Sequence, residues 1–274
     1  MKDYSPEHNR HKICDYTDTD YAAFWDNTQR EYEDAVERIA LRRLTKGMTG
    51  TCVEIGAGFG RLVSEYAHLC TSVTLTDYAE NMIEQARLRV EHLGFRHVQC
   101  MQADLYRLDS CGRKFNNAIC VRVLHHVESV PAFFEQVNGV LEDDGVFIFE
   151  YANKKNLVEI LRYLLKRPNI EPFEYYPGQR GSGVYYNFHP QYIADMLDQC
   201  GFVIEDTLSV SLFRNKTMKK IFGPRFLTKL ESLLQRPLAC LHLSPSVFIK
   251  ARKRKSVCHG PGIVVTAQKK HRNK

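Results

Sequence analysis

The fold of this chain is decided by the segment TCVEIGAGFGRL, residues 51–62. Its first part, 51–55, is a short apolar run with β-branched residues, which predicts a buried strand. Three alternate glycines end the run, and apolar residues at helical spacing follow from Arg61 onward. A strand, a glycine turn and a helix allow the backbone to approach a nucleotide closely and to direct helix N–H groups towards it. The segment therefore predicts a binding site of the nucleotide type.

The spacing of the glycines and of two acids narrows the choice of ligand. A dinucleotide fingerprint would need glycine at position 61, where this chain has Arg61. Asp77 follows Gly56 by 21 residues, about where a ribose-binding carboxylate is expected. The pattern Glu-x-Gly-x-Gly-x-Gly, which begins at Glu54, resembles motif I of the class I S-adenosylmethionine-dependent methyltransferases. A tight turn with a purely structural role is the alternative that three glycines alone leave open.

Length and composition favour one large domain with an ordinary soluble core, and the cysteines indicate its compartment. The chain has 274 residues, of which 44% are hydrophobic, so one large domain or one domain with an insertion is expected. No apolar stretch approaches the roughly 18 residues of a membrane-spanning helix. The nine cysteines show no C-x-x-C spacing, and Cys52, Cys100 and Cys120 fall in expected strands. This usage predicts a reducing, cytoplasmic location and argues against a disulfide framework or a zinc ribbon.

The positive charge of the chain is concentrated at its C-terminal end. The net charge is +6, but residues 250–274 hold nine Lys or Arg and no acid, so the rest carries about −3. A solvated tail is the simplest interpretation, and a patch for RNA or anionic surfaces is the alternative.

Strands and helices alternate along most of the chain, which is typical of parallel strands with crossover helices. After the first strand, strands are expected at 72–76, 97–101, 117–122, 145–150 and 202–209, and helices at 79–92, 130–141 and 191–200. Either 246–252 or 262–267 closes the sheet, and the other segment would pair with it as an edge hairpin. Together with the resemblance, this predicts an α/β fold: a Rossmann-like, doubly wound, seven-stranded and mostly parallel sheet with an antiparallel last strand. Helical and loop insertions are expected to cover the active site.

The chain divides into a short N-terminal part and a long methyltransferase domain. Residues 1–45 are expected to form a tail and a lid helix, and 46–274 the domain, with insertions at about 153–190 and 210–245 and a basic C-terminal tail. The long helical pattern at 18–44 has an aromatic first half. It either packs on the sheet edge or forms a lid over the cofactor.

The two insertions differ in composition. Leucines and isoleucine line one face of an expected helix at 156–166, and we expect this stripe to pack against the domain. The segment 167–190 is rich in aromatics and predicts part of a substrate cover. The segment 212–236 is basic and amphipathic, which predicts a helical cap; a membrane-surface or partner helix is the alternative.

Polar residues follow several expected strands at their carboxyl ends, where open parallel sheets bind their ligands. The resemblance implies that Asp77 binds the ribose hydroxyls, Asp104 the adenine amine, and Tyr78 and Leu105 the adenine ring. Glu54 would orient the glycine loop, without facing the core, or accept from the methionine ammonium. Arg122 would meet the methionine carboxylate or form a structural ion pair. The expected cofactor-binding set is Glu54, Gly56, Ala57, Gly58, Gly60, Asp77, Tyr78, Asp104, Leu105 and Arg122.

Methyl transfer from a sulfonium is a direct displacement, so a general base is needed only when the acceptor must lose a proton. His125 and His189 are the expected bases, because histidine titrates near neutral pH. His126, Tyr185 and Tyr186 are weaker candidates, and no metal-ligand spacing is evident.

The expected acceptor is a small or medium organic molecule, methylated on oxygen, nitrogen or carbon. The chain has no Asn/Asp-Pro-Pro-aromatic segment and no Pro-Cys pair, which argues against several base-modifying classes. The alternatives are an RNA or protein methyltransferase that uses the basic tail, and a non-catalytic, methyltransferase-like partner subunit. The oligomeric state is left open.

Overall fold

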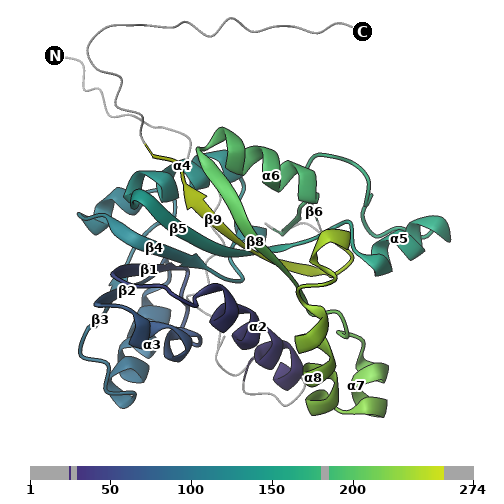
Figure 1. Cartoon of the computed structure of the whole chain (residues 1–274), viewed down its shortest axis with the longest axis horizontal. Helices are drawn as coiled ribbons and strands as arrows, with labels where there is room; N and C mark the ends of the chain where they lie inside the picture. Colours follow the sequence, from purple (N-terminus) through teal and green to yellow (C-terminus); the bar gives the residue numbers. More distant parts are fainter. Residues whose placement is uncertain (1–24, 26–29, 180–184, 256–274) are drawn as a thin grey trace, which may run out of the picture.

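Seven strands form one twisted sheet in the computed structural model, which describes residue 25, residues 30–179 and residues 185–255. The strands are β1 (Thr51–Ile55), β2 (Ser72–Asp77), β3 (Val98–Gln102), β4 (Phe115–Cys120), β5 (Leu141–Ala152), β8 (Phe202–Val210) and β9 (Ser246–Lys253). Their order is β3-β2-β1-β4-β5-β9-β8 (Figure 1). β1 to β5 pair in parallel, whereas β9 runs antiparallel to both β5 and β8. The predicted seven-stranded, mostly parallel sheet with an antiparallel last strand is confirmed.

Helices cover both faces of the sheet (Figure 1). One face packs against α4 (Val130–Val140) and α6 (Pro190–Gln199), and the other against α2 (Glu31–Leu44) and α3 (Glu80–His92). Successive side chains of a strand point to opposite faces. In β5, Phe147 and Phe149 therefore join the core under α4 and α6, and Ile148 joins the core under α2 and α3.

The strands expected from 51 to 150 and at 202–209 are present, as are the helices expected at 79–92, 130–141 and 191–200, and the closing strand is identified as β9. Cys52, Cys100 and Cys120 lie in strands β1, β3 and β4, as predicted. The other candidate for the closing strand, 262–267, lies outside the described residues, as does the basic tail beyond residue 255. None of the described helices combines the length and apolarity needed to cross a bilayer.

The prediction of a helix directly after the glycine turn is wrong. Two short 3-10 helices, Val63–Glu65 and Ala67–Leu69, occupy this place. The Arg38 guanidinium donates to the Arg61 carbonyl oxygen at 3.0 Å. In an α-helix, this carbonyl oxygen would accept from the Glu65 N–H. The Glu65 N–H bonds to the Leu62 carbonyl instead. This site therefore has no α-helix N-terminus aimed at a ligand after β1.

The Asp-Asp-Gly segment at 143–145, which is a turn signal in the sequence, lies within β5. Leu141 pairs with Phe115, and the next pair is Val146 with Asn117. More residues separate these pairs on β5 than on β4, so β5 contains a bulge. Asp144 adopts a positive φ of 60° within it. The turn signal in the sequence corresponds to a bulge that the flanking strand pairs enclose.

The N-terminal helix packs on the sheet. α2 buries Tyr32, Val36, Ala40 and Leu41 in the core and contacts α8 (Pro224–Leu234). The expected start of this helix, at 18–24 and 26–29, lies outside the described residues. The interpretation as a packed helix is confirmed for its described part.

The two insertions leave the sheet at the ends of β5 and β8. The first contains α5 (Leu157–Leu164) and a small ladder of β6 (Gly178–Gln179) and β7 (Tyr186–Asn187); the second contains α7 (Lys216–Phe222) and α8. The prediction that the α5 stripe packs against the domain is wrong, since Leu157, Leu161 and Leu164 are exposed. Within the described chain, Glu159 is the only buried residue of α5.

Candidate active site

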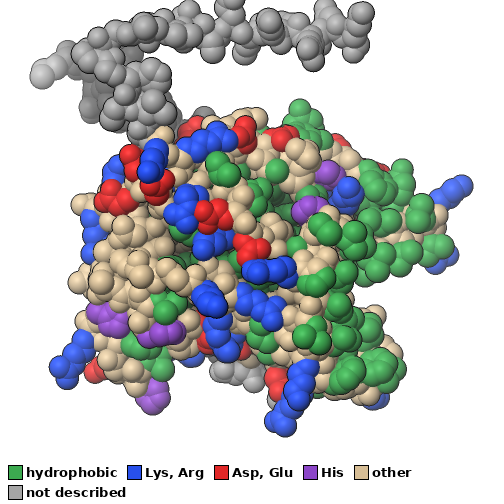
Figure 2. All heavy atoms as spheres, in the orientation of Figure 1, with side chains coloured by type: hydrophobic (Ala, Val, Ile, Leu, Met, Phe, Trp, Pro, Cys, Tyr) green, Lys and Arg blue, Asp and Glu red, His purple; other side chains and the backbone are tan. Residues whose placement is uncertain are grey.

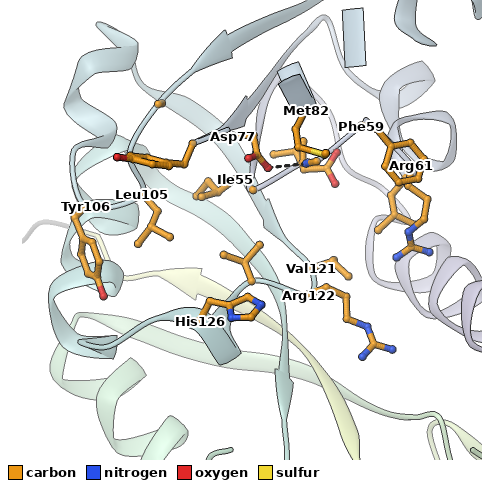
Figure 3. A pocket seen from close by; sticks show the side chains of 18 residues that line it. Ile55, Phe59, Arg61, Asp77, Met82, Leu105, Tyr106, Val121, Arg122 and His126 are labelled. Atoms are coloured by element: carbon orange, nitrogen blue, oxygen red, sulfur yellow. Dashed lines mark hydrogen bonds between the residues drawn. The ribbon is translucent and has the colours of Figure 1, made fainter. Parts of the chain in front are cut away.

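A cavity opens at the carboxyl edge of the sheet, where β1, β2, β3 and β4 end (Figure 3). Its walls come from the glycine loop, from Asp77, Tyr78 and Met82, from the turn after β3, and from the segment that follows β4. The predicted convergence of scattered strand ends is therefore present for Glu54, Asp77 and Arg122.

The glycine loop forms the wall after β1 and depends on backbone that other residues rarely adopt. Gly56, Gly58 and Gly60 all have positive φ. A Cβ atom on Gly56 would lie 2.3 Å from Val123 Cγ2, so this glycine lets the loop approach the segment after β4. Gly60 does not line the cavity; a Cβ there would meet Leu75 and Ala86 instead. Gly60 therefore seats the loop on β2 and α3.

Asp77 joins the glycine loop to the start of α3. Its carboxylate accepts from the Gly58 N–H at 2.8 Å (Figure 3). It also accepts from the Ala79 N–H at 3.0 Å. Each carboxylate oxygen can accept a further hydrogen bond. The side chain is thus oriented by the backbone and still faces the cavity.

Glu54 is buried and also lines the cavity, so the expectation that it does not face the core is wrong. It lies on β1, and the Tyr66 hydroxyl donates to its carboxylate. Burial raises the pKa of Glu54 to about 7, although the Tyr66 hydrogen bond and the Arg61 charge oppose this shift. A cationic group in the cavity would favour the charged form.

Arg122 forms the structural ion pair that the sequence left open. Its guanidinium donates to Glu37, and the Arg61 guanidinium donates to the other Glu37 oxygen at 2.7 Å. Glu37 is fully buried on α2. Burial opposes its ionisation, but the charges of Arg122 and Arg61 hold the pKa of Glu37 below its usual range. The Trp25 ring lies against Arg61, with 3.7 Å between Cζ and the ring centroid.

Glu37 was not predicted as a site residue, because it lies within the apolar face of a helix and belongs to no recognisable sequence motif. Its neighbours Val36 and Ala40 are buried, and the helical spacing places Glu37 beside them. An acid at a core position of a helix is the only signal that could have indicated it.

The turn after β3 presents apolar groups to the cavity. Leu105 and Tyr106 line it, but Asp104 does not. One Asp104 oxygen accepts from the Tyr106 N–H at 2.8 Å, which shapes the turn that carries Leu105. Tyr78 also lines the cavity and is 42% exposed, so its ring is accessible to a ligand.

Among the histidines, His126 lines the cavity, across from Asp77 and Met82 (Figure 3). His125 is buried behind it, with ring centroids 4.1 Å apart, and its ring also contacts Tyr185 at 4.7 Å. Burial, helped by His126 and two arginines, lowers the pKa of His125 well below its usual range. His189 caps α6, where Nδ1 accepts from the Gln191 N–H, and does not line the cavity.

The described parts of the insertions do not line the cavity, contrary to the expected cover. The Tyr185 ring contacts the rings of His125 and His126. Within the described residues no group of three or more His, Cys, Asp or Glu could hold a metal ion. All seven described cysteines are free.

Residues 53–147 match the family model of the methyltransferase domain. Two curated relatives match over shorter shares: a protein-L-isoaspartate O-methyltransferase of Nitrobacter winogradskyi and a ubiquinone biosynthesis O-methyltransferase of Rickettsia felis. The first is 27% identical over 39% of this chain and 46% of its own length. The second is 26% identical over 40% of this chain and 44% of its own. The chain thus spans under half the length of either relative.

Solved structures extend the likeness to most of the fold. Magnesium protoporphyrin IX methyltransferase of Synechocystis PCC 6803, with bound SAH, aligns with a TM-score of 0.58 at 19% identity. The alignment covers 87% of this chain and 96% of that chain. The chain therefore shares the fold of this methyltransferase, and its residues 53–147, which hold the glycine loop and Asp77, match the methyltransferase domain model.

Proposed function

We propose that this chain transfers a methyl group from S-adenosylmethionine to a small or medium organic acceptor. The observation that carries the proposal is the cavity at the carboxyl edge, where Asp77 is oriented by the glycine loop and a histidine lies across from it. The family match over residues 53–147 supports the same activity.

The residues around the cavity fit the donor molecule. Asp77 offers carboxylate oxygens for the two ribose hydroxyls, a charge-assisted contact. Tyr78 and Leu105 offer apolar surfaces for the adenine ring. Glu54 would accept from the methionine ammonium, and a cation there would favour its charged form. Gly56, Ala57 and Gly58 supply the backbone wall.

The geometry changes the roles that we assign to Asp104, Arg122 and Gly60. Asp104 holds the turn through one oxygen, and its other oxygen is the one we assign to the adenine amine. The Arg122 guanidinium is hydrogen-bonded to Glu37. We therefore assign Arg122 a structural role in the cavity wall, ahead of a role in binding the methionine carboxylate. Gly60 acts through the position of the loop.

The bound donor supplies an electrophilic methyl group on a sulfonium. The chain has to align the acceptor with that group and exclude water. If the acceptor is a hydroxyl, His126 is the group in the cavity that can take its proton. His125 and Tyr185 contact the His126 ring and hold its orientation. We assign His125 this positioning role, and His189 acts only as the cap of α6 in the described structure.

The acceptor is the open part of the proposal. Both curated relatives are named as O-methyltransferases, so hydroxyl and carboxyl compounds are the first acceptors to assay. The cavity has an open mouth and an apolar lining with a few polar groups, which is typical of sites for small organic ligands.

The test is incubation of the full chain with methyl-labelled donor and a metabolite extract, followed by mass spectrometry of labelled products. We expect label in one or a few small molecules, and much less label with the Asp77→Ala variant when the donor is below saturation. Label found only in RNA or only in protein would overturn the choice of acceptor. Absence of donor binding by calorimetry would overturn the enzymatic proposal in favour of a non-catalytic subunit.

A further inference from the structure

Exposed apolar side chains are concentrated on the two insertions. Of 18 large apolar side chains that are exposed in the described chain, 13 lie within 157–176 and 221–241. We call these 13 side chains the insertion face; its most exposed members include Leu164, Leu165, Ile221 and Leu233. Figure 2 shows hydrophobic side chains gathered over both projections, α5 and the α7–α8 pair. Contiguous exposed apolar surface on a soluble domain usually marks a contact surface.

Aromatic contacts on the insertion face occur at the surface. The rings of Phe222 and Phe226 stack at 6.1 Å between centroids, although both residues are more than half exposed. Tyr163 and Phe173 make an edge contact at 5.4 Å and are also exposed. In the described chain these rings are covered only in part, so they are available to a partner.

Basic residues accompany these apolar residues. Residues 214–236 contain seven Lys or Arg and a single acid, Glu231, which is buried. Glu231 accepts from the Ser211 and Leu212 N–H groups, so its carboxyl faces inward. The tip of α5 ends in exposed Lys166 and Arg167. The surface around the apolar residues of α7 and α8 is therefore positive, whereas residues 157–176 hold three Lys or Arg and three acids.

Both projections leave the sheet at its carboxyl edge. α5 follows the end of β5, and α7 follows the end of β8, which runs parallel to β5 because both are antiparallel to β9. The cavity lies at this same edge. A flat partner that contacts both projections would thus meet the side of the molecule on which the cavity opens.

The combination of charge and apolarity selects the partner. A second copy of the chain would bring two positive surfaces together, which is unfavourable. An anionic bilayer surface offers an apolar layer to the insertion face and negative headgroups to the Lys and Arg beside it. With eight and seven residues, α5 and α7 are too short to span a bilayer and suit its interface.

We propose that the insertion face docks this protein on the surface of an anionic lipid bilayer. The apolar side chains of α5, α7 and α8 enter the interface, while Lys220, Arg225 and Lys229 contact lipid headgroups. The proposal does not depend on the methyl-transfer activity and stands if the acceptor is not a lipid.

The test is co-sedimentation of the full chain with vesicles of phosphatidylcholine and phosphatidylglycerol in about equal amounts, and with phosphatidylcholine alone. We expect binding to the anionic vesicles that weakens with salt. The double variant Ile221→Ser/Phe222→Ser should lose at least about tenfold in binding, because two apolar side chains no longer enter the interface. The double variant Lys220→Gln/Arg225→Gln should bind anionic vesicles about fivefold more weakly for each cation removed, at low salt.

The matched control is Leu88→Ser/Leu93→Ser on and beside α3, where the side chains are also exposed but lie outside the insertion face. It should bind like the unchanged chain. All variants should keep the same unfolding midpoint in urea, since the altered side chains are exposed.

Equal binding by the Ile221→Ser/Phe222→Ser variant would overturn the proposal and assign lipid binding to another part of the chain, such as the basic tail. No binding to anionic vesicles would also overturn it. A concentration-dependent dimer in light scattering that this double variant abolishes would identify a second copy as the occupant instead. Methyl transfer in solution is measured separately, so the two proposals fail independently.

Discussion

The sheet frame, residues 31–152, and the two insertions differ in which side chains they bury and which they expose. In the frame, apolar groups are buried on both faces of the sheet, and several charged groups near the cavity are buried and paired. In the insertions, many large apolar groups are exposed and most charged groups face outward. Buried charges fix the shape of a site because moving them costs free energy. Exposed apolar groups stabilise the fold little and are instead available for contacts.

The largest effect is expected for Glu37→Gln, which tests the buried charges of the frame. The change leaves Arg61 and Arg122 without the carboxylate that bridges them. We expect a loss of about 3–5 kcal/mol in the free energy of unfolding, as for one partner of a buried ion pair. Urea denaturation measures it, with Glu84→Gln, an exposed acid on α3, as the control. Equal midpoints for the two variants would contradict the bridging role.

The next effect concerns Glu54, whose pKa burial raises from an ordinary value of 4.5 to about 7. Between these values the folded protein holds a proton that the unfolded chain has lost. The contribution of protonated Glu54 to stability is therefore complete at a pH below its pKa in the unfolded chain. It is lost as the pH rises through about 7, its pKa in the folded protein. The total is roughly 3 kcal/mol between about pH 4.5 and pH 8.

The Glu54→Gln variant should lose this part of the pH dependence. Urea denaturation of both proteins at several pH values measures the difference. If the two curves of unfolding free energy against pH are parallel, Glu54 is not protonated in the folded protein at neutral pH.

A smaller effect is expected for Asp77→Ala. Removing the carboxylate that faces the cavity should weaken donor binding by about 1–3 kcal/mol, the range for loss of a charged acceptor. Isothermal calorimetry with S-adenosylmethionine measures it. Asp109→Ala, in the 3-10 helix 108–111 outside the cavity lining, serves as the control. Unchanged affinity of Asp77→Ala would mean that the ribose is held elsewhere.

The smallest effect is expected for Leu164→Ser on the insertion face. Leu164 is 67% exposed, so the change should alter the free energy of unfolding by less than about 0.5 kcal/mol. Phe134→Ala in the frame, where the side chain is fully buried, should cost about 3–5 kcal/mol. Urea denaturation of both variants compares the regions directly. A large loss for Leu164→Ser would show that the α5 stripe is part of the folded core after all.

Local pattern was sufficient for most of the fold. Alternating apolar runs and turn signals placed the strands β1 to β5, β8 and β9, because strand periodicity and glycine conformation are properties of neighbouring residues. The same holds for Gly56 and Asp77, whose spacing identified the glycine loop and its acid before any contact was known. The exposure of the α5 stripe was not predictable, since an apolar helical face carries no information on whether another element covers it.

The sequence alone determined the strands β1 to β5 and β8, the glycine loop and the identity of its acid, because these follow from residue types at short and fixed separations. It left open which segment closes the sheet. Tertiary structure alone decided the partners of the buried charges. Glu37, Arg61 and Arg122 are distant in sequence and meet only when α2 packs on the sheet. The 3-10 helices after the loop were decided in the same way, because Arg38 of α2 takes the Arg61 carbonyl. Such contacts depend on which elements become neighbours, and no local pattern records that.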